Sequence, residues 1–244
     1  MGSPTPHTAD ALRRRPIVVV NPNASDAVTR SIEASVSTLS TEREPVRCVT
    51  LRDGPPAIES HADFERAIPC VGRFIRNETE AAGFVVACFS DPGVAEARSA
   101  TARPVVGVQE ASVALALTLG STFGIVALVE ASVERQRRAL TATGLLGRLA
   151  GSRPVGLGIA ALADEAVAWP RIRGVGERLC LEDGADVLVL GCAGMGAYRI
   201  PLERELGIPV VDPCQAGVAV AQARIRLGLS HRVSPRDAFD PARA

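Results

Sequence analysis

Short apolar runs rich in β-branched residues alternate with amphipathic stretches along most of the chain. Apolar runs bounded by turn residues are typical of buried strands, and apolar residues three or four apart are typical of helices. Near-continuous apolar strands between helices indicate a parallel sheet covered on both faces. The predicted strands are 16–21, 46–51, 83–88, 104–108, 123–128, 154–159, 186–191 and 208–211, and the predicted helices are 24–38, 62–79, 94–102, 110–119, 130–144, 162–182, 200–206 and 214–226.

The order of these elements repeats. The first four strands form one set and the last four form a second set, each with helices between its strands. In each set the third strand ends at a cysteine, Cys88 or Cys192, and the two cysteines are about as far apart in sequence as the first strands of the two sets. The two sets are not otherwise alike in sequence, so the repeat is one of architecture.

Charge and hydropathy exclude several kinds of partner. The formal net charge is zero, which gives no attraction for nucleic acid or an anionic membrane surface. No apolar run approaches the roughly 20 residues of a membrane span. The arginines at 13–15 precede an apolar run of only 17–20, which is too short for a secretion signal. We therefore expect a cytoplasmic protein with reduced thiols that acts on a small molecule.

The chain contains no lysine, so all 27 of its basic residues are arginine. This excludes pyridoxal-phosphate enzymes, which need a lysine Schiff base, and Walker-A nucleotide sites. The three histidines are His7, His61 and His231, and only His61 lies away from the polar ends, so a hydrolase with a histidine base would depend on it. None of the six cysteines forms a CxxC pair, which leaves no zinc or thioredoxin motif.

Cys88 and Cys192 carry the strongest indication of chemistry. Each ends an apolar strand and is followed by a short glycine-containing turn, the place where open α/β sheets bind ligands. Two thiols from two similar sets suggest chemistry on both faces of one small molecule. The turns after them offer backbone N–H groups that can stabilise charge on a carbonyl oxygen during proton abstraction, and a helix start lowers a thiol pKa. We interpret Cys48, Cys70 and Cys180 as buried apolar residues, and Cys214 as a further candidate for the same cleft.

Three polar segments near strand ends have two interpretations each. Asn23 and Ser25 follow the first strand and can either cap the next helix or bind substrate. Asp91 either opposes a nearby thiolate through the charge of its carboxylate or caps the helix that follows, and we prefer the N-cap because Asp91 precedes Pro92. The proline-containing loop 54–61 is either a plain connection or a rigid wall over the cleft.

Five segments together resemble the aspartate/glutamate racemase superfamily and, within it, the hydantoin and allantoin racemases. These segments are VVNPNAS, DGPPAIESHADFERA, ACFSDPG, LGCAGM and GIPVVDPCQAGVAVA, and the resemblance runs from Ile17 to about Leu227. It implies an α/β fold of two similar lobes, each a parallel sheet flanked by helices, related by a pseudo-two-fold axis with the active site between them. The first lobe would comprise 16–115 and 214–228 and the second 116–213, with flexible tails at 1–15 and 229–244.

The resemblance also implies the chemistry. Cys88 and Cys192 would be the two catalytic groups, one removing an α-proton as thiolate and the other delivering a proton to the opposite face as thiol. It implies no metal or cofactor, and a homo-oligomer. The substrate-binding positions that we predict are Asn23, Ser25, Pro56, Ala57, Phe89, Ser90, Ala127, Leu128, Ala193 and Gly194.

Four positions depart from the hydantoin racemase pattern. Ala127 and Leu128 stand where two threonines are typical, Ala57 where a serine is often found, and Cys214 where glycine is usual. These changes make the predicted pocket less polar. The predicted function is a racemase of a 5-substituted hydantoin or a related cyclic ureide such as allantoin.

Other functions remain open at this point. Amino-acid racemase and maleate isomerase-like chemistry fit two cysteines, whereas arylmalonate decarboxylase-like members use only one. A small-molecule binding protein without activity is the remaining alternative, and the chain has neither the signal peptide nor the basic helical appendage that such proteins usually carry.

Overall fold

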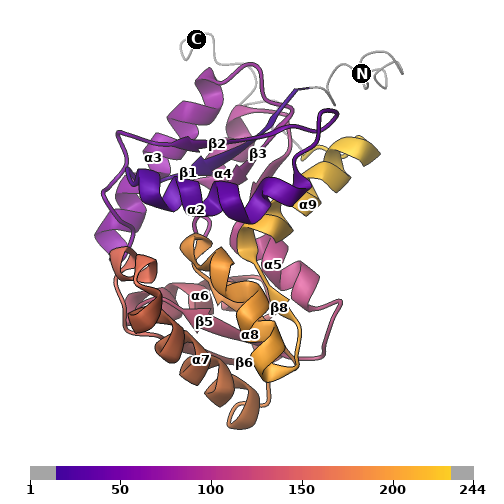
Figure 1. The fold of residues 1–244 in the computed structure, drawn as a ribbon. Helices are drawn as coiled ribbons and strands as arrows, with labels where there is room; N and C mark the ends of the chain where they lie inside the picture. The colour runs from indigo at the N-terminus through magenta and orange to yellow at the C-terminus, as the bar shows by residue number, and fades with distance from the viewer. Residues whose placement is uncertain (1–14, 232–244) are drawn as a thin grey trace.

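The computed structural model describes residues 15–231, which form two four-stranded parallel sheets with helices packed around them (Figure 1). The strands are β1 (Ile17–Asn21), β2 (Val46–Thr50), β3 (Gly83–Val86), β4 (Val105–Gly107), β5 (Phe123–Ala127), β6 (Leu149–Pro154), β7 (Val187–Gly191) and β8 (Val210–Val211). The α-helices are α2 (Asp26–Val36), α3 (His61–Asn77), α4 (Val94–Ala100), α5 (Val108–Ala116), α6 (Glu130–Ala142), α7 (Glu165–Leu181), α8 (Arg199–Leu206) and α9 (Pro213–Leu227). Short 3₁₀ helices are η1 (Ser37–Leu39), η2 (Leu146–Arg148), η3 (Ile159–Ala163) and η4 (Ala193–Tyr198).

The two sheets have the same topology. The strand order is β2-β1-β3-β4 in the first sheet and β6-β5-β7-β8 in the second, with every pair parallel. This confirms the predicted fold of two similar α/β lobes, which we call the first lobe (the β1–β4 sheet with its helices) and the second lobe (the β5–β8 sheet with its helices). The last helix, α9, returns to the first sheet and packs on β1, β3 and β4. The exact lobe boundaries stay a prediction.

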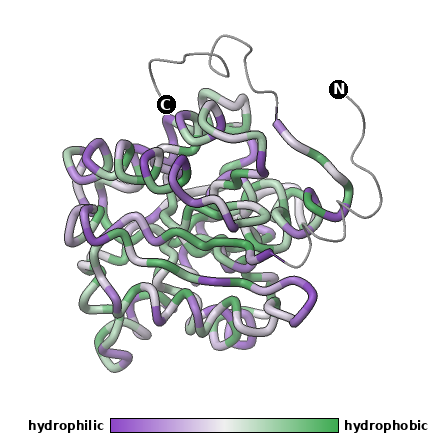
Figure 2. Tube along the Cα trace, turned by 90° about the horizontal axis from the view of Figure 1, so that it is seen from above, coloured by the Kyte–Doolittle hydropathy of each residue, from purple (hydrophilic) through white to green (hydrophobic). Residues whose placement is uncertain are grey.

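Three hydrophobic cores result from the alternation of side chains along the strands. Val18 and Val20 of β1 belong to an outer core under α3 and α4, and the second lobe has its own outer core under α7. Ile17 and Val19 point the opposite way into a central core that includes apolar residues of both sheets, α5 and α9. Figure 2 shows the hydrophobic segments gathered along the strands in the interior. The central core therefore fixes the two lobes against each other.

Gly217 allows α9 to lie directly on the first sheet. A Cβ atom at this position would approach Val85 Cγ1 to 2.7 Å and Val108 Cγ1 to 3.1 Å. A distance under 3 Å is one that real Cβ atoms do not occupy, so any side chain here would push α9 away from β3. The seat of α9, and with it the central core, depends on this glycine.

The predicted strand at 154–159 is wrong. The strand in this region is β6 (Leu149–Pro154), and the chain then leaves the sheet and enters η3 at Ile159. β6 is an edge strand with half-buried side chains, so it carries polar residues that an apolar pattern misses. One of them is Arg153, whose Nε donates to Asp183 Oδ2 at 2.7 Å. Pro154 ends the strand because proline has no N–H for the ladder.

Asp91 caps a helix, but not the one that follows it. The N-cap residue of α4 is Gly93, with φ of 74°, and the Asp91 carboxylate instead accepts hydrogen bonds from Gln109 N at 2.8 Å and Glu110 N at 2.9 Å in the first turn of α5. Ser90 and Asp91 reach this arrangement with positive φ values of 121° and 54°. Such backbone is strained for residues other than glycine, so the two bonds hold the turn after β3 in place.

The flexible tails predicted at 1–15 and 229–244 stay largely a prediction. The predicted tails lie outside the described residues, apart from Arg15 and residues 229–231. Within residues 15–231, none of the helices is long and apolar enough to span a bilayer.

Replacing Asp91 with alanine should destabilise the fold, because two N–H groups at the start of α5 would lose their acceptor. We expect a loss of about 1 to 2 kcal/mol in the free energy of unfolding, measured by urea denaturation. Glu96→Ala, at an exposed position of α4, is the control and should leave the midpoint nearly unchanged. Equal midpoints for the two variants would contradict the capping role.

Candidate active site

A cavity of about 30 Å³ lies between the carboxyl ends of the two sheets. Cys88 follows β3, and Cys192 directly follows β7. These two strands occupy equivalent positions, since each is third in the strand order of its own sheet. Both thiol-bearing residues line the cavity. The full lining consists of Asn23, Val28, Ile58, Ala87, Cys88, Phe89, Leu128, Ser132, Ile159, Gly191, Cys192 and Ala193.

The structure brings half of the predicted site residues to this cavity. The predicted positions that line it are Asn23, Cys88, Phe89, Leu128, Cys192 and Ala193. The predicted positions that do not line it are Ser25, Pro56, Ala57, Ser90, Ala127 and Gly194. Cys214 is also absent from the lining, and it is fully buried with its Sγ 3.9 Å from the carbonyl oxygen of Ala193. His61 lies at the exposed start of α3 beside Glu65, away from the cavity.

Both thiols have raised pKa values, contrary to the lowering expected from the helix starts that follow them. Burial raises the pKa of Cys88, as does the nearby Cys192, while the Arg135 guanidinium opposes the shift. Burial likewise raises the pKa of Cys192 to about 11, although the N–H of Gly194 donates to it. Removal from water thus outweighs the backbone donors, so both groups are neutral thiols at neutral pH.

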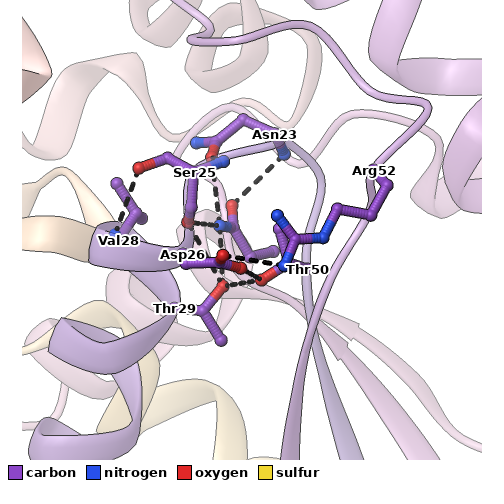
Figure 3. A network of polar contacts seen from close by, with 8 residues as sticks. Asn23, Ser25, Asp26, Val28, Thr29, Thr50 and Arg52 are labelled. Atoms are coloured by element: carbon purple, nitrogen blue, oxygen red, sulfur yellow. Dashed lines mark hydrogen bonds and ion pairs between the residues drawn. The ribbon is translucent and has the colours of Figure 1, made fainter.

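Asn23 is held by a network of polar groups at the end of β1 (Figure 3). Its amide oxygen accepts from Asn21 Nδ2 at 3.0 Å and from Ser25 N at 2.9 Å. The network continues to Thr29, Thr50, Asp26 and Arg52. Because its oxygen has two donors, Asn23 keeps its NH₂ group as a donor for a ligand. Ser25 is the N-cap of α2 and accepts from Val28 N, which bears out the capping interpretation for that residue.

The loop after β2 forms one wall of the cavity and contacts the opposite lobe. Ile58 lines the cavity, and the next residue, Glu59, accepts a hydrogen bond from Ile159 N at 2.6 Å. Ile159 belongs to η3 of the second lobe, so this bond joins the two lobes beside the cavity. The loop packs closely on the turn after β1, since a Cβ on Gly54 would lie 2.3 Å from the Pro22 carbonyl oxygen.

Four features near the cavity escaped the sequence interpretation. Ile159 falls within the predicted strand 154–159, but in the structure it begins η3. The sequence marks Glu59 only as part of the loop 54–61. Ser132 of α6 lines the cavity. Its Oγ accepts a hydrogen bond from Arg135 Nη2 at 3.2 Å. The charged run that contains Arg135 has three arginines in four residues, and nothing in the sequence separates Arg135 from its neighbours.

The site offers thiols, amide donors and apolar walls. In the part of the chain that the structure describes, no group of three or more metal-ligating side chains comes together. Two thiols that share one cavity can exchange protons with a carbon atom held between them, and carbonyl oxygens on that molecule can accept from Asn23.

Comparison with known proteins identifies relatives along most of the chain. Residues 17–221 match the sequence profile of the family described as Asp/Glu/Hydantoin racemase. The hydantoin racemase of Pseudomonas sp. (strain NS671) is 34% identical over 215 residues, which is 87% of this chain and 86% of that protein. The hydantoin racemase of Paenarthrobacter aurescens is also 34% identical, over 87% of this chain and 92% of that one. The solved allantoin racemase from Klebsiella pneumoniae superposes with a TM-score of 0.87 at 33% identity, covering 93% of this chain and 94% of that one.

The raised thiol pKa values predict a late titration. As pH rises from 7 to 9, Cys88 and Cys192 should stay protonated, and thiolate absorbance from Cys192 should develop only towards pH 11. Ultraviolet absorbance is recorded for the wild type and for Cys192→Ser during an alkaline titration. The difference between the two curves gives the thiolate absorbance of Cys192 alone. A thiolate signal for Cys192 near pH 7 would show that backbone donors outweigh burial.

Proposed function

Because the chain belongs to the Asp/Glu/Hydantoin racemase family, we propose that it racemises a 5-substituted hydantoin or a related cyclic ureide such as allantoin, without a cofactor. The observation that carries this proposal is the placement of Cys88 and Cys192 at equivalent strand ends on one cavity. A homo-oligomeric assembly and a cytoplasmic location remain predictions from the sequence.

The reaction would proceed by transfer of two protons at one carbon. One of the two thiols first loses its proton to solvent, which its raised pKa makes infrequent at neutral pH. The resulting thiolate removes the proton from the ring carbon beside the carbonyl group, and the electron pair moves onto the carbonyl oxygen as an enolate. The thiol of the other cysteine then gives its proton to the opposite face of that carbon. The two cysteines exchange protonation states, and the opposite enantiomer is processed by the reverse sequence.

Donors near the cysteines would stabilise the enolate. The amide oxygen of Asn23 already accepts from Asn21 and Ser25, so the side chain is held in place and its NH₂ group can donate to an oxyanion without reorganisation. Preorganised donors of this kind are most effective in a site with little water, and the cavity is walled by apolar residues from both lobes.

The apolar wall would select the substituent on the ring. Leu128 lines the cavity together with Ile58 and Ile159. Ala127 is fully buried and does not line the cavity. The wall thus offers contacts to hydrocarbon rather than hydroxyl groups, which favours a substrate with an aliphatic chain on the ring.

Cys88→Ser and Cys192→Ser should each lose racemisation, because a hydroxyl is a far weaker acid than a thiol and therefore neither ionises to a usable base nor delivers a proton readily. We expect a fall in kcat of at least about 100-fold for each variant, the lower range for loss of a general acid or base. Optical rotation of single enantiomers of 5-substituted hydantoins and allantoin measures the rate.

Cys180→Ser is the matched control, because Cys180 is a half-buried thiol of α7 that does not line the cavity. It should retain the wild-type rate. Wild-type racemisation by either cavity variant, with folding verified by circular dichroism, would refute the assignment of two catalytic thiols.

A further inference from the structure

Arg135 is a half-buried cation, and the part of its guanidinium that is shielded from solvent lacks a full set of partners. Its Nε and Nη1 atoms are shielded from solvent, and neither has a hydrogen-bond partner within residues 15–231. Its Nη2 atom donates to Ser132 Oγ at 3.2 Å. A guanidinium stays charged at every physiological pH, and each unmet buried donor on it is costly. The structure therefore maintains several N–H donors that a ligand could satisfy.

The carboxylate of Asp63 does not form an ion pair with Arg135. Asp63 of α3 acts on it through its charge, but no ion pair forms. One oxygen of Asp63 accepts from Ser60 N and Oγ in the capping box of α3, and the other binds Arg66. Asp63 is thus engaged elsewhere, and Arg135 forms no ion pair with any carboxylate among residues 15–231. By contrast, Arg138 on the same helix is exposed and paired with Glu134.

Arg135 adjoins the wall of the cavity. Ser132, its hydrogen-bond partner, lines the cavity, and the charge of Arg135 acts on Cys88. Phe64 of α3 packs against the guanidinium, with its ring centroid 5.9 Å from Cζ. This stacking holds the cation between α6 of the second lobe and α3 of the first. The rest of the lining is mostly apolar, apart from Asn23 and the two thiols, so Arg135 adds a positive charge beside a site of low polarity.

We propose that Arg135 determines specificity by binding a carboxylate at the end of the substrate's side chain, so that the preferred substrate is a ring carrying an acidic aliphatic substituent. This rests on the proposed racemase function of the same cavity. The apolar wall would contact the methylene groups of the substituent, while the unsatisfied donors of Arg135 and the hydroxyl of Ser132 would bind its carboxylate. A charge-assisted pair of this kind is among the stronger hydrogen bonds that proteins form.

Two nearly isosteric probes test this proposal. One is 5-(2-carboxyethyl)hydantoin, and the other is its neutral amide, 5-(2-carbamoylethyl)hydantoin. Racemisation of each is followed with the wild type, Arg135→Gln, Arg135→Lys and the control Arg138→Gln. The wild type should prefer the carboxylate, and Arg135→Gln should lose about 10- to 100-fold in kcat/KM for it, mainly through KM. The amide should change less than about threefold, Arg135→Lys should recover part of the preference, and Arg138→Gln should match the wild type.

Other results would overturn the proposal. Equal losses for both probes in Arg135→Gln, with a shifted pH profile, would mean that Arg135 acts on the Cys88 thiolate instead. A wild type that racemises both probes equally would also refute carboxylate recognition, while leaving the racemase function intact.

If the wild type racemises neither probe, the binding of the two probes distinguishes the racemase proposal from the proposal that Arg135 recognises a carboxylate. The racemase proposal for hydantoins then fails, and calorimetric titration of both probes still decides the role of Arg135. Tighter binding of the carboxylate that disappears in Arg135→Gln would support the proposal. Equal or undetectable binding of the two probes would refute it.

Discussion

The central core that the two sheets share is the constraint on which the site depends. Alternate side chains of β1 divide between an outer core and this central one, where Ile17 and Val19 join apolar residues of the second sheet. Helices α5 and α9 pack within it, and Gly217 lets α9 lie against β3. Since neither sheet can turn without opening this core, the ends of β3 and β7 are held facing one cavity.

Burial also sets the chemistry of the thiols. It raises the pKa of Cys88 and of Cys192, so both sulfur atoms hold their protons more tightly than an exposed thiol does. The opposing influences differ between the two, since Arg135 acts on Cys88 and the Gly194 N–H on Cys192. A low-dielectric site makes a thiolate base costly to form, but it strengthens the electrostatic interactions with an enolate that forms between the two thiols. The lobes are also joined beside the cavity, where Glu59 accepts from Ile159.

Periodicity predicted the fold well where the physics is local. Apolar strands such as β1 and β7 are buried on both faces and could be identified from hydrophobicity alone. The edge strand β6 could not, because its half-buried positions tolerate polar residues such as Arg153. The cysteines at strand ends were found because topology brings such positions together. Arg135 could not be found in this way, because only the three-dimensional structure of residues 15–231 shows that its Nε and Nη1 atoms have no hydrogen-bond partner.

Solvent isotope exchange tests the central claim most directly, namely that two thiols act on opposite faces of one carbon. A single enantiomer of a racemised hydantoin is incubated with the enzyme in deuterium oxide, and both enantiomers are separated after a few per cent conversion. The account predicts deuterium at the ring carbon of the product and protium in the remaining substrate, after correction for exchange without enzyme. Product that retains the substrate's own proton would show that a single group moves it between faces, and would contradict the two-thiol mechanism.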